Sequence, residues 1–380
     1  MTDGIYIGLD IGGTLAKVVC VAPSESIKET IARFPSAVLS HDKFSDTEND
    51  IRPSDLGSII PDPSVERSFA MFSFTSRAID PLLDFLKFLF LTKKVFPSCI
   101  NVTGGGALKF QNELSAAFQQ SRFIKVDEMD AIAGGFSFLV RRPNSAFLFD
   151  SQTLSRTPVP SEEVASPFPL LLVNIGSGVS MILINGPGNY RRVQGSPIGG
   201  GTVLGLGKAL FQASSFEEIM ELSMSGDSSK VDLSVGELLG ASPDDEFWNV
   251  NTLAASLAKL NTLAATNASR ADLAQSIVRM VSYNIGYIAY LVSCLHNVGR
   301  IYFSGKYVNK HIPTMEAIAY AVKFYENWKP PPNAAETTDR DSSYGRNHRH
   351  RDHRCDVRFL HQEGYVGAIG ALLVDGKETS

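Results

Sequence analysis

The sequence predicts a two-domain α/β protein, because two segments of the same design stand at the head of its two halves. In each, a β-run leads into a glycine-rich turn with a small hydroxyl residue, and a second β-run follows. The first spans residues 5–21 with its turn at 11–14, and the second spans 170–184 with its turn at 174–178. Glycines lack a Cβ, so they let backbone N–H groups approach an anion closely. Two such turns would hold the polyphosphate of ATP from two sides, in a cleft between related domains.

Length and composition agree with this architecture. The chain has 380 residues, enough for two domains with separate cores, and is 44% hydrophobic and 20% charged. A net charge of -5 argues against a nucleic-acid partner. Four scattered cysteines form no C-x-x-C pair, so neither a disulfide scaffold nor a zinc site is indicated. The start of the chain has no pattern of a targeting segment, and the apolar stretch around residues 85–91 is too short to cross a bilayer, so we expect a cytoplasmic protein with no membrane partner.

The first half is predicted to form one domain over residues 1–150. Strands are expected at residues 5–10, 15–21, 99–103 and 123–126. Helices are expected at residues 80–94, 107–120 and 127–140, the first opening with Asp80 as the N-cap and Pro81 at the first helical position. Residues 22–72 are polar and interrupted by prolines, and they predict no element.

Residues 151–168 are rich in Ser, Thr and Pro, which favours a connection to a second domain over residues 169–376. Ser269 and Asp272 resemble a capping box, and apolar residues then recur at helical spacing, so a long helix is expected at 269–294.

Near the end of the chain, residues 331–356 lack periodicity and carry many His and Arg residues, which favours a flexible insertion over a metal site or a patch for an acidic partner. A small-residue helix at 364–373 is expected to pack back on the core.

The two turns predict an ATP site. Asp10 precedes the first turn and is placed to hold Mg²⁺, which takes few carboxylates and keeps several waters. A plain hairpin turn is the alternative for either segment, but the presence of two favours phosphate binding. Gly199 to Thr202 open a helix, and a helix N-terminus attracts anions. The expected ATP-binding residues are Asp10, Gly12, Gly13, Thr14, Lys17, Gly176, Gly178, Gly200, Gly201, Thr202 and Gly305.

Two charged side chains are candidates for further roles. Phosphoryl transfer to an alcohol needs a base for the hydroxyl proton, and Glu128 stands where a strand enters a helix. Its alternative role is that of a helix-capping acid. Arg192 follows the second turn and can pair with an anionic substrate or cofactor, or it can be a solvated strand arginine.

Gly104 to Gly106 after a strand either face the nucleotide or make a tight turn.

Several blocks in order resemble the type II (eukaryotic-type) pantothenate kinases of the acetate and sugar kinase/Hsp70/actin superfamily. The blocks lie at residues 10–17, 103–107, 127–130, 172–180, 199–202, 205–206, 216–218, 226–228, 284–286 and 363–373. They extend over nearly the whole chain, and their combination is more specific than any single block.

The resemblance implies a two-domain actin-like ATPase (ribonuclease H-like) fold with the ATP site in the inter-domain cleft. It implies ATP-dependent phosphorylation of pantothenate, the first step of coenzyme A synthesis. Glu128 matches the family's catalytic base, and Ser177, Ser180 and Arg192 match positions that bind pantothenate or acetyl-CoA. A homodimer through the long helix and feedback inhibition by a coenzyme A thioester are implied as well.

One segment departs from the family pattern, and two other functions stay open. Residues 255–258 read Ala-Ser-Leu-Ala where the family has Ser-Ser-Phe-Gly, so the backbone there is expected to differ. A sugar kinase of the same superfamily would use the same turns, with an aspartate expected as its base. A regulatory subunit would keep the fold and lose the base, whereas Glu128 and Asp10 are present here.

Overall fold

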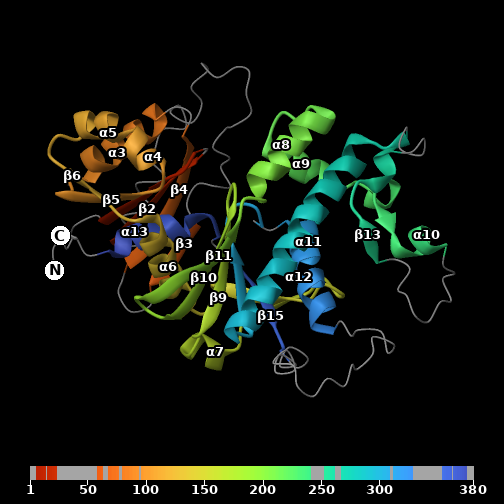
Figure 1. Ribbon diagram of the computed structural model, residues 1–380. Helices are drawn as coiled ribbons and strands as arrows, with labels where there is room; N and C mark the ends of the chain where they lie inside the picture. The colour runs from red at the N-terminus through yellow and green to blue at the C-terminus, as the bar shows by residue number, and fades with distance from the viewer. Residues whose placement is uncertain are drawn as a thin grey trace, which may run out of the picture. The chain divides into compact units, whose positions relative to one another are not determined.

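The computed structural model describes residues 6–13, 15–23, 58–62, 67–76, 79–93, 96–240, 252–261, 267–308, 311–327, 353–361 and 363–374. The chain forms two compact units. Unit 1 comprises Met1–Arg142 and Gly364–Ser380, and unit 2 comprises Pro143–Glu363. Each unit contains its own large β-sheet (Figure 1).

The sheet of unit 1 has the strand order β3-β4-β2-β1-β5-β6. Its strands are β1 (Tyr6–Ile11), β2 (Leu15–Pro23), β3 (Ser58–Asp62), β4 (Arg67–Thr75), β5 (Cys99–Thr103) and β6 (Arg122–Lys125). The pairs β1/β2, β2/β4 and β3/β4 are antiparallel, whereas β1/β5 and β5/β6 are parallel. The predicted hairpin at the start of the chain is therefore the centre of this sheet, and β3 and part of β4 lie in a stretch for which no element was predicted.

Alternation along β1 separates its core face from its functional face. Ile7, Leu9 and Ile11 are buried in the hydrophobic core of unit 1, while Gly8 and Asp10 point to the opposite face of the sheet. Asp10 is thus carried by a strand whose position is fixed by its buried neighbours.

Within the described part of unit 1, five helices cover the two faces of this sheet. They are α3 (Asp80–Lys93), α4 (Gly106–Lys109), α5 (Gln111–Ala117), α6 (Glu128–Leu139) and α13 (Val366–Leu373). Helices α3, α4 and α5 lie on one face, and α6 and α13 lie on the other (Figure 1). The predicted single helix at 107–120 is wrong: Phe110 leaves helical dihedral angles (φ -108°, ψ 18°) with its side chain buried, and it separates α4 from α5.

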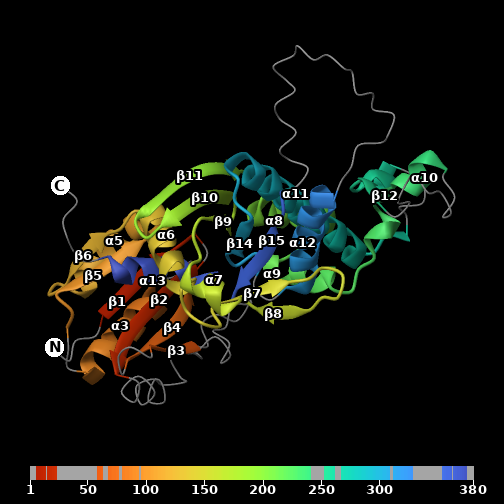
Figure 2. The same ribbon diagram turned by 90° about the horizontal axis from the view of Figure 1, so that it is seen from below.

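The last described helix belongs to unit 1, which corrects the predicted domain boundary at residue 376. Helix α13 lies against β1 and α6 (Figure 2). The approach is close because glycines line it: a Cβ on Gly8 would overlap Ala368 O, and a Cβ on Gly370 would overlap Ala131 O. A helix of small residues is needed here for contact with both the strand and the neighbouring helix.

The sheet of unit 2 has the order β11-β10-β9-β14-β15-β7-β8. Its strands are β7 (Ala146–Phe149), β8 (Arg156–Pro158), β9 (Leu170–Ile175), β10 (Val179–Gly186), β11 (Asn189–Ser196), β14 (Arg300–Ser304) and β15 (Asp356–Leu360). The pairs β9/β10 and β10/β11 are antiparallel, and β9/β14 and β14/β15 are parallel. The run β11-β10-β9-β14-β15 repeats the order and directions of β4-β2-β1-β5-β6 in unit 1. Two units with this ribonuclease H-like topology constitute the actin-like ATPase fold, as predicted.

The segment expected to connect the domains is part of unit 2. Strands β7 and β8 extend its sheet, and α7 (Ser161–Ala165) is tied to it by a buried ion pair. Arg358 Nη2 on β15 donates to Glu163 Oε2 at 2.6 Å, and Tyr302 on β14 donates to Glu163 Oε1 at 2.7 Å. The predicted boundaries at residues 150 and 168 are therefore replaced by one boundary after Arg142.

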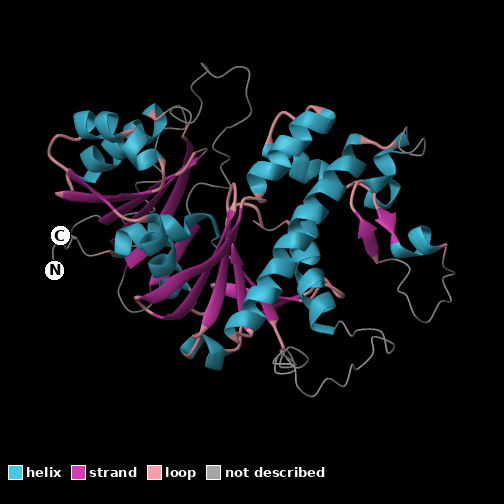
Figure 3. Cartoon of the chain, viewed as in Figure 1, coloured by secondary structure: helices cyan, strands magenta, loops and turns pink. Residues whose placement is uncertain are grey.

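The helical layer of unit 2 packs on one face of its sheet (Figure 3). Among the residues described in this unit, the helices and short 3-10 turns are α7, α8 (Gly200–Phe211), α9 (Phe216–Ser223), η2 (Ser228–Lys230), α10 (Val235–Leu239), η3 (Ala258–Asn261), α11 (Arg270–His296), α12 (Ile312–Asn327) and η7 (Glu363–Tyr365), the last two residues of which belong to unit 1. A small sheet is formed by β12 (Leu233–Ser234) and β13 (Leu253–Ala255).

Helix α11 is the long helix expected from the capping box. Ser269 and Asp272 make the reciprocal bonds of the box, and Asn297 ends the helix in the left-handed conformation. By length and composition this helix could cross a membrane, although no such segment was expected from the sequence. In unit 2, however, 56% of the 18-residue apolar stretch of this helix is buried, and the helix packs against α12, α9 and α8. Its apolar character is thus explained by the core.

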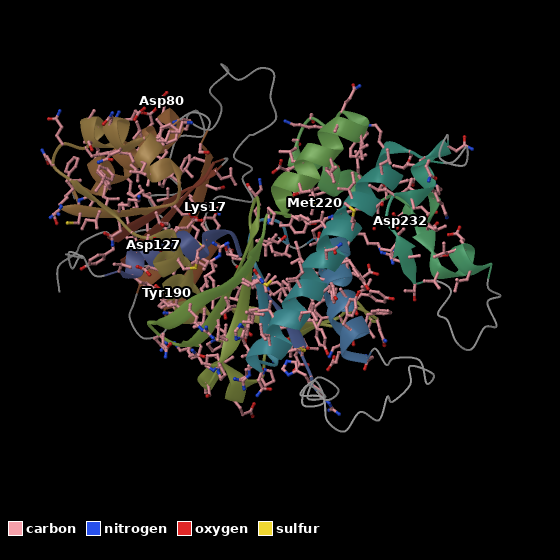
Figure 4. The ribbon with its side chains drawn as sticks, in the orientation of Figure 1. Lys17, Asp80, Asp127, Tyr190, Met220 and Asp232 are labelled. Atoms are coloured by element: carbon pink, nitrogen blue, oxygen red, sulfur yellow. The ribbon has the colours of Figure 1, made fainter. Side chains whose placement is uncertain are left out.

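The segment that departs from the family pattern carries a strained residue. Leu257 has φ +58°, a conformation that costs a non-glycine residue about 1 kcal/mol. Asp232 (Figure 4) is buried, and its Oδ1 accepts a hydrogen bond from Leu257 N at 2.9 Å and another from Ser276 Oγ on α11. The carboxylate thereby holds this turn against the long helix.

The described residues resume at His353, before the predicted end of the insertion at 356. Cys355 is fully buried, its N–H donates to Glu326 Oε1 at 3.2 Å, and its Sγ lies 3.0 Å from Ser293 Oγ. Asp356 already belongs to β15. The insertion prediction is wrong for residues 353–356, and residues 331–352 lie outside the described part of the chain.

Candidate active site

The first predicted turn follows β1 in unit 1. Gly12 N donates to Leu15 O at 2.9 Å and closes the turn. Gly13 is exposed, and a Cβ added to it would meet nothing within 4 Å. The backbone at Gly13 is therefore open to a ligand, as a phosphate-binding turn requires. Thr14 lies outside the described residues.

Asp10 and Lys17 face each other across the β1/β2 hairpin. They are partners in the strand register, and Lys17 Nζ lies 3.7 Å from Asp10 Oδ2. Each side chain is about one-fifth exposed, at 20%. Lys17 (Figure 4) thus places a cation beside the carboxylate at the entrance to the turn.

Two glycines that were not predicted as site residues border the Asp10 carboxylate. Gly104 follows β5 with φ +85°, and a Cβ there would lie 2.8 Å from Asp10 Oδ1. Gly367 is on α13, and a Cβ there would lie 2.8 Å from Asp10 Oδ2. Two roles were considered for the glycine run at 104–106, a nucleotide-facing role and a tight turn. In the structure this run packs on the first turn. Nothing in the sequence around Gly367 pointed to Asp10.

Glu128 is the first residue of α6, at the end of β6. Asp127 (Figure 4) is the N-cap, and its Oδ1 accepts from Met129 N at 2.8 Å and from Asp130 N at 3.3 Å. The capping function that was the alternative for Glu128 is therefore performed by Asp127. Strands β1, β5 and β6 are parallel neighbours, so Asp10, Gly104 and Glu128 gather at their carboxyl ends, the usual ligand-binding edge of such sheets.

The surroundings of Glu128 raise the pKa of its carboxyl group. Partial loss of hydration contributes most, followed by the negative charges of Asp10 and Asp127, while Lys17 acts in the opposite direction. A raised pKa makes a carboxylate a stronger proton acceptor, and this is the property that a general base needs.

The second turn belongs to unit 2 and is supported by the start of α8. Gly200 N donates to Gly176 O, and Gly201 N donates to Ser177 O, both at 2.9 Å. A Cβ on Gly199 would lie 2.8 Å from Ser177 O, so only glycine permits this packing. Gly176 and Ser177 remain exposed. The predicted turn and the predicted helix start thus form one compact element.

Three further predicted ATP-site residues have structural partners in this element. Thr202 Oγ1 accepts from Gly199 N and donates to Pro197 O, each at 3.3 Å, so it caps α8. A Cβ on Gly178 would lie 3.0 Å from Ser196 O. Gly305 has φ +107°, and a Cβ on it would overlap Ile175 O at the end of β9. Glycine at these positions lets neighbouring segments pack around the turn, and contact with ATP stays a prediction.

Ser180 and Arg192 come together on the β10/β11 hairpin. Ser180 is the register partner of Gly195, and a Cβ on Gly195 would lie 2.5 Å from Arg192 Nη2. The Arg192 guanidinium therefore lies over Gly195, next to the strand position of Ser180. Arg192 is exposed, as a residue that binds a soluble anion must be.

The donor set suits a magnesium nucleotide better than a metal held by protein alone. Within the described residues, no group of three or more His, Cys, Asp or Glu side chains could hold a metal ion. A metal at Asp10 would take its other ligands from phosphate oxygens and water, which is how Mg²⁺ binds in nucleotide sites. The open backbone of the first turn, next to Asp10 and Lys17, fits such a group.

Comparison with known proteins covers nearly the whole chain. The family model described as Fumble matches residues 6–374. A pantothenate kinase of Schizosaccharomyces pombe is 30% identical over 97% of this chain and 81% of its own length. Pantothenate kinase 1 of Arabidopsis thaliana is 30% identical over 97% of this chain and 85% of its own. A 4'-phosphopantetheine phosphatase of Mus musculus is also 30% identical, over 96% of this chain, although that match covers only 40% of the mouse protein.

These matches include both segments that carry the two turns and the residues around Glu128. The chain belongs to the Fumble family, the type II pantothenate kinases.

Proposed function

We propose that this chain is a pantothenate kinase, which transfers the γ-phosphoryl group of ATP to the primary hydroxyl of pantothenate and forms 4'-phosphopantothenate, the first step of coenzyme A synthesis. The observation that carries the proposal is Glu128 at the start of α6, with a raised pKa, beside Asp10 and Lys17 in a Fumble-family chain.

In the proposed reaction, Glu128 accepts the proton of the pantothenate hydroxyl. The oxygen then forms its bond to the γ-phosphorus as the bond to the β-phosphate oxygen breaks, and ADP leaves. Lys17 and the exposed backbone at Gly13 neutralise charge on the phosphates. Asp10 would hold Mg²⁺, which would offset negative charge on the phosphates.

Ser177, Ser180 and Arg192 of unit 2 are the proposed substrate residues. Pantothenate carries a carboxylate, and the exposed Arg192 guanidinium beside Ser180 is suited to pair with it. A coenzyme A thioester contains the same pantothenate-derived arm together with phosphates. We propose that such a thioester, acetyl-CoA among them, inhibits the enzyme at these residues.

The main alternative is a family member without kinase activity. The mouse relative is named a phosphatase, so similarity over this region does not by itself establish kinase activity. The presence of Glu128 and Asp10 favours an active kinase here. A sugar kinase is the other alternative, and it was expected to have an aspartate as base.

The test is phosphoryl transfer from ATP with a panel of acceptors: pantothenate, pantetheine and glucose. Purified chain should convert pantothenate to a product heavier by one phosphate, detected by mass spectrometry together with ADP release. Preference for glucose would identify a sugar kinase. Pantothenate-independent ADP release, or no turnover with a folded protein that still binds ATP, would contradict the proposal.

A further inference from the structure

The Asp10 carboxylate lies between two glycines from different parts of the chain. Gly104 borders Oδ1 and Gly367 borders Oδ2. The two positions differ in what else a side chain would meet. A Cβ on Gly104 would also lie 2.5 Å from Ile11 O. Any residue that replaces Gly104 would in addition have to adopt φ +85°, a conformation that side chains disfavour. Substitution of Gly104 would therefore disturb the backbone of the first turn.

Gly367 is different, because the three nearest atoms to an added Cβ all belong to the Asp10 side chain. They are Oδ2 at 2.8 Å, Cγ at 3.1 Å and Cβ at 3.5 Å. The first distance is shorter than real Cβ contacts, whereas the last is ordinary van der Waals contact. The φ angle of Gly367 is not positive, so its backbone conformation permits an alanine. A methyl group at this position would thus collide with the carboxylate and with little else.

Moving helix α13 away from Asp10 to relieve this collision would open three close backbone contacts. A Cβ on Gly8 would overlap Ala368 O, a Cβ on Gly135 would overlap Val366 O, and a Cβ on Gly370 would overlap Ala131 O. These contacts hold the helix backbone against β1 and α6. Closely packed backbone moves less readily than the end of a side chain. The Asp10 carboxylate would therefore rotate while the helix stays in place.

We propose that Gly367 is a positioning residue for Asp10: by leaving space at Oδ2, it lets the carboxylate take the orientation used for Mg²⁺-ATP. The inference rests on the metal role of Asp10 in the proposed function. It makes the last described helix part of the site in unit 1, although residues 364–373 had been expected only to pack on the core.

The test compares Gly367→Ala with Gly134→Ala, a control on α6 where an added Cβ meets nothing within 4 Å. ATP binding is measured by calorimetry with and without Mg²⁺, and melting temperature is measured by circular dichroism without nucleotide. Gly367→Ala should weaken ATP binding about tenfold or more with Mg²⁺. Without Mg²⁺ it should bind ATP as the unsubstituted chain does, and its melting temperature should be close to that of the control.

A double variant shows whether Gly367 acts through Asp10. Asp10→Asn should weaken Mg²⁺-dependent binding, and adding Gly367→Ala should weaken it little further, because contacting residues are not additive. Equal losses with and without Mg²⁺, full additivity, or unchanged binding in Gly367→Ala would overturn the inference. If Asp10→Asn itself leaves Mg²⁺ dependence unchanged, the metal role in the proposed function fails and the inference fails with it.

A folding defect in Gly367→Ala also gives a result. Asp10→Ala removes Oδ2 and Cγ, the two atoms nearest to the added methyl group, and keeps only Cβ at 3.5 Å, which is ordinary contact. The variant Asp10→Ala with Gly367→Ala should therefore fold even if Gly367→Ala does not. Recovery of the melting temperature would support the contact with Asp10. Loss of folding in both variants would show that Gly367 is required for packing alone.

Discussion

The reactivity of Glu128 depends on three charged side chains of unit 1. Asp10 and Asp127 raise the pKa of its carboxyl group, and Lys17 lowers it, in addition to the larger effect of lost hydration. The role of Glu128 as the proposed base can therefore be tested in two ways. Glu128 itself can be replaced, and each of the three neighbours can be replaced separately to shift the pH dependence of activity.

Glu128→Gln should retain the fold and ATP binding and lose about 10²–10⁴ in turnover, because the amide cannot accept the hydroxyl proton. Asp130→Asn, two residues further along α6, is the matched control and should keep most of the activity. Turnover of Glu128→Gln within a few-fold of the unsubstituted chain would place the base elsewhere.

Lys17→Met should move the acidic limb of the kcat/KM profile to higher pH. The base acts in its deprotonated form, so removing a nearby cation raises the pKa below which activity is lost. Asp127→Asn should move the limb to lower pH, and asparagine is as good an N-cap as aspartate, so α6 should be kept. Lys87→Met on α3 is the control. Shifts in the same direction for Lys17→Met and Asp127→Asn would exclude Glu128 as the titrating group.

Arg192→Ala should weaken inhibition by acetyl-CoA about ten- to hundredfold, through loss of a charged hydrogen bond, and should weaken ATP binding less. The inhibition is expected to be competitive with ATP. Inhibition constants at several ATP concentrations measure both effects. The control is Arg191→Ala, which changes the neighbouring exposed arginine. Inhibition that ATP cannot relieve, or equal sensitivity of the two variants, would contradict the proposed site.

At the scale of elements, glycines decide which segments reach the turns. The start of α8 packs on the second turn through Gly199 and Gly200, and α13 packs on β1 at Gly8 and on α6 at Gly370. Elsewhere, charged groups attach short elements to the sheets. The five-residue helix α7 is the clearest case, since a buried ion pair ties it to β15.

Arg358→Met should destabilise unit 2 by about 3 kcal/mol, because it leaves the Glu163 carboxylate buried without its main cation. The two side chains are only 3% and 11% exposed, so solvent cannot replace the lost partner. Urea unfolding followed by circular dichroism measures the effect. The control is Glu162→Gln, which changes the exposed neighbour of Glu163 on α7. An equally small loss of unfolding free energy in both variants would show that α7 is only loosely attached.

At the scale of the whole molecule, two units with one topology carry different sets of the proposed functional residues. Unit 1 holds Asp10, Lys17 and Glu128, and unit 2 holds the second turn with Ser180 and Arg192. Helix α11 of unit 2 also presents Leu291 and Leu295, one helical turn apart and 46% and 75% exposed. We propose that this face of α11 forms the homodimer expected for the family.

Leu295→Glu should convert a dimer of the chain to a monomer, because a carboxylate cannot be buried in an apolar interface without a large penalty. Sedimentation velocity measures the mass. Leu91→Glu on α3 of unit 1, where the leucine is 66% exposed, is the control and should stay dimeric. A monomeric unsubstituted chain, or a dimer that survives Leu295→Glu, would contradict an interface through α11.

Local patterns in the sequence were sufficient for the features that neighbouring residues determine. Both glycine turns, the hairpins that carry them, and the Ser269–Asp272 capping box are confirmed, because each depends on residues close together in the chain. The fold class is confirmed because the same strand–turn–strand pattern heads both units. The roles of Glu128, Ser177, Ser180 and Arg192 stay predictions, although the structure brings Glu128 near Asp10 and Ser180 near Arg192.

Only the tertiary structure decided which unit each segment joins. Composition suggested a connection at residues 151–168, but buried partners on β14 and β15 make those residues part of unit 2. A run of small residues predicted a last helix packed on the core, but it could not say that this helix lies against β1, from the other end of the chain. Propensity and capping depend on adjacent residues, whereas the space beside Asp10 depends on a glycine that folding brings from the far end of the sequence.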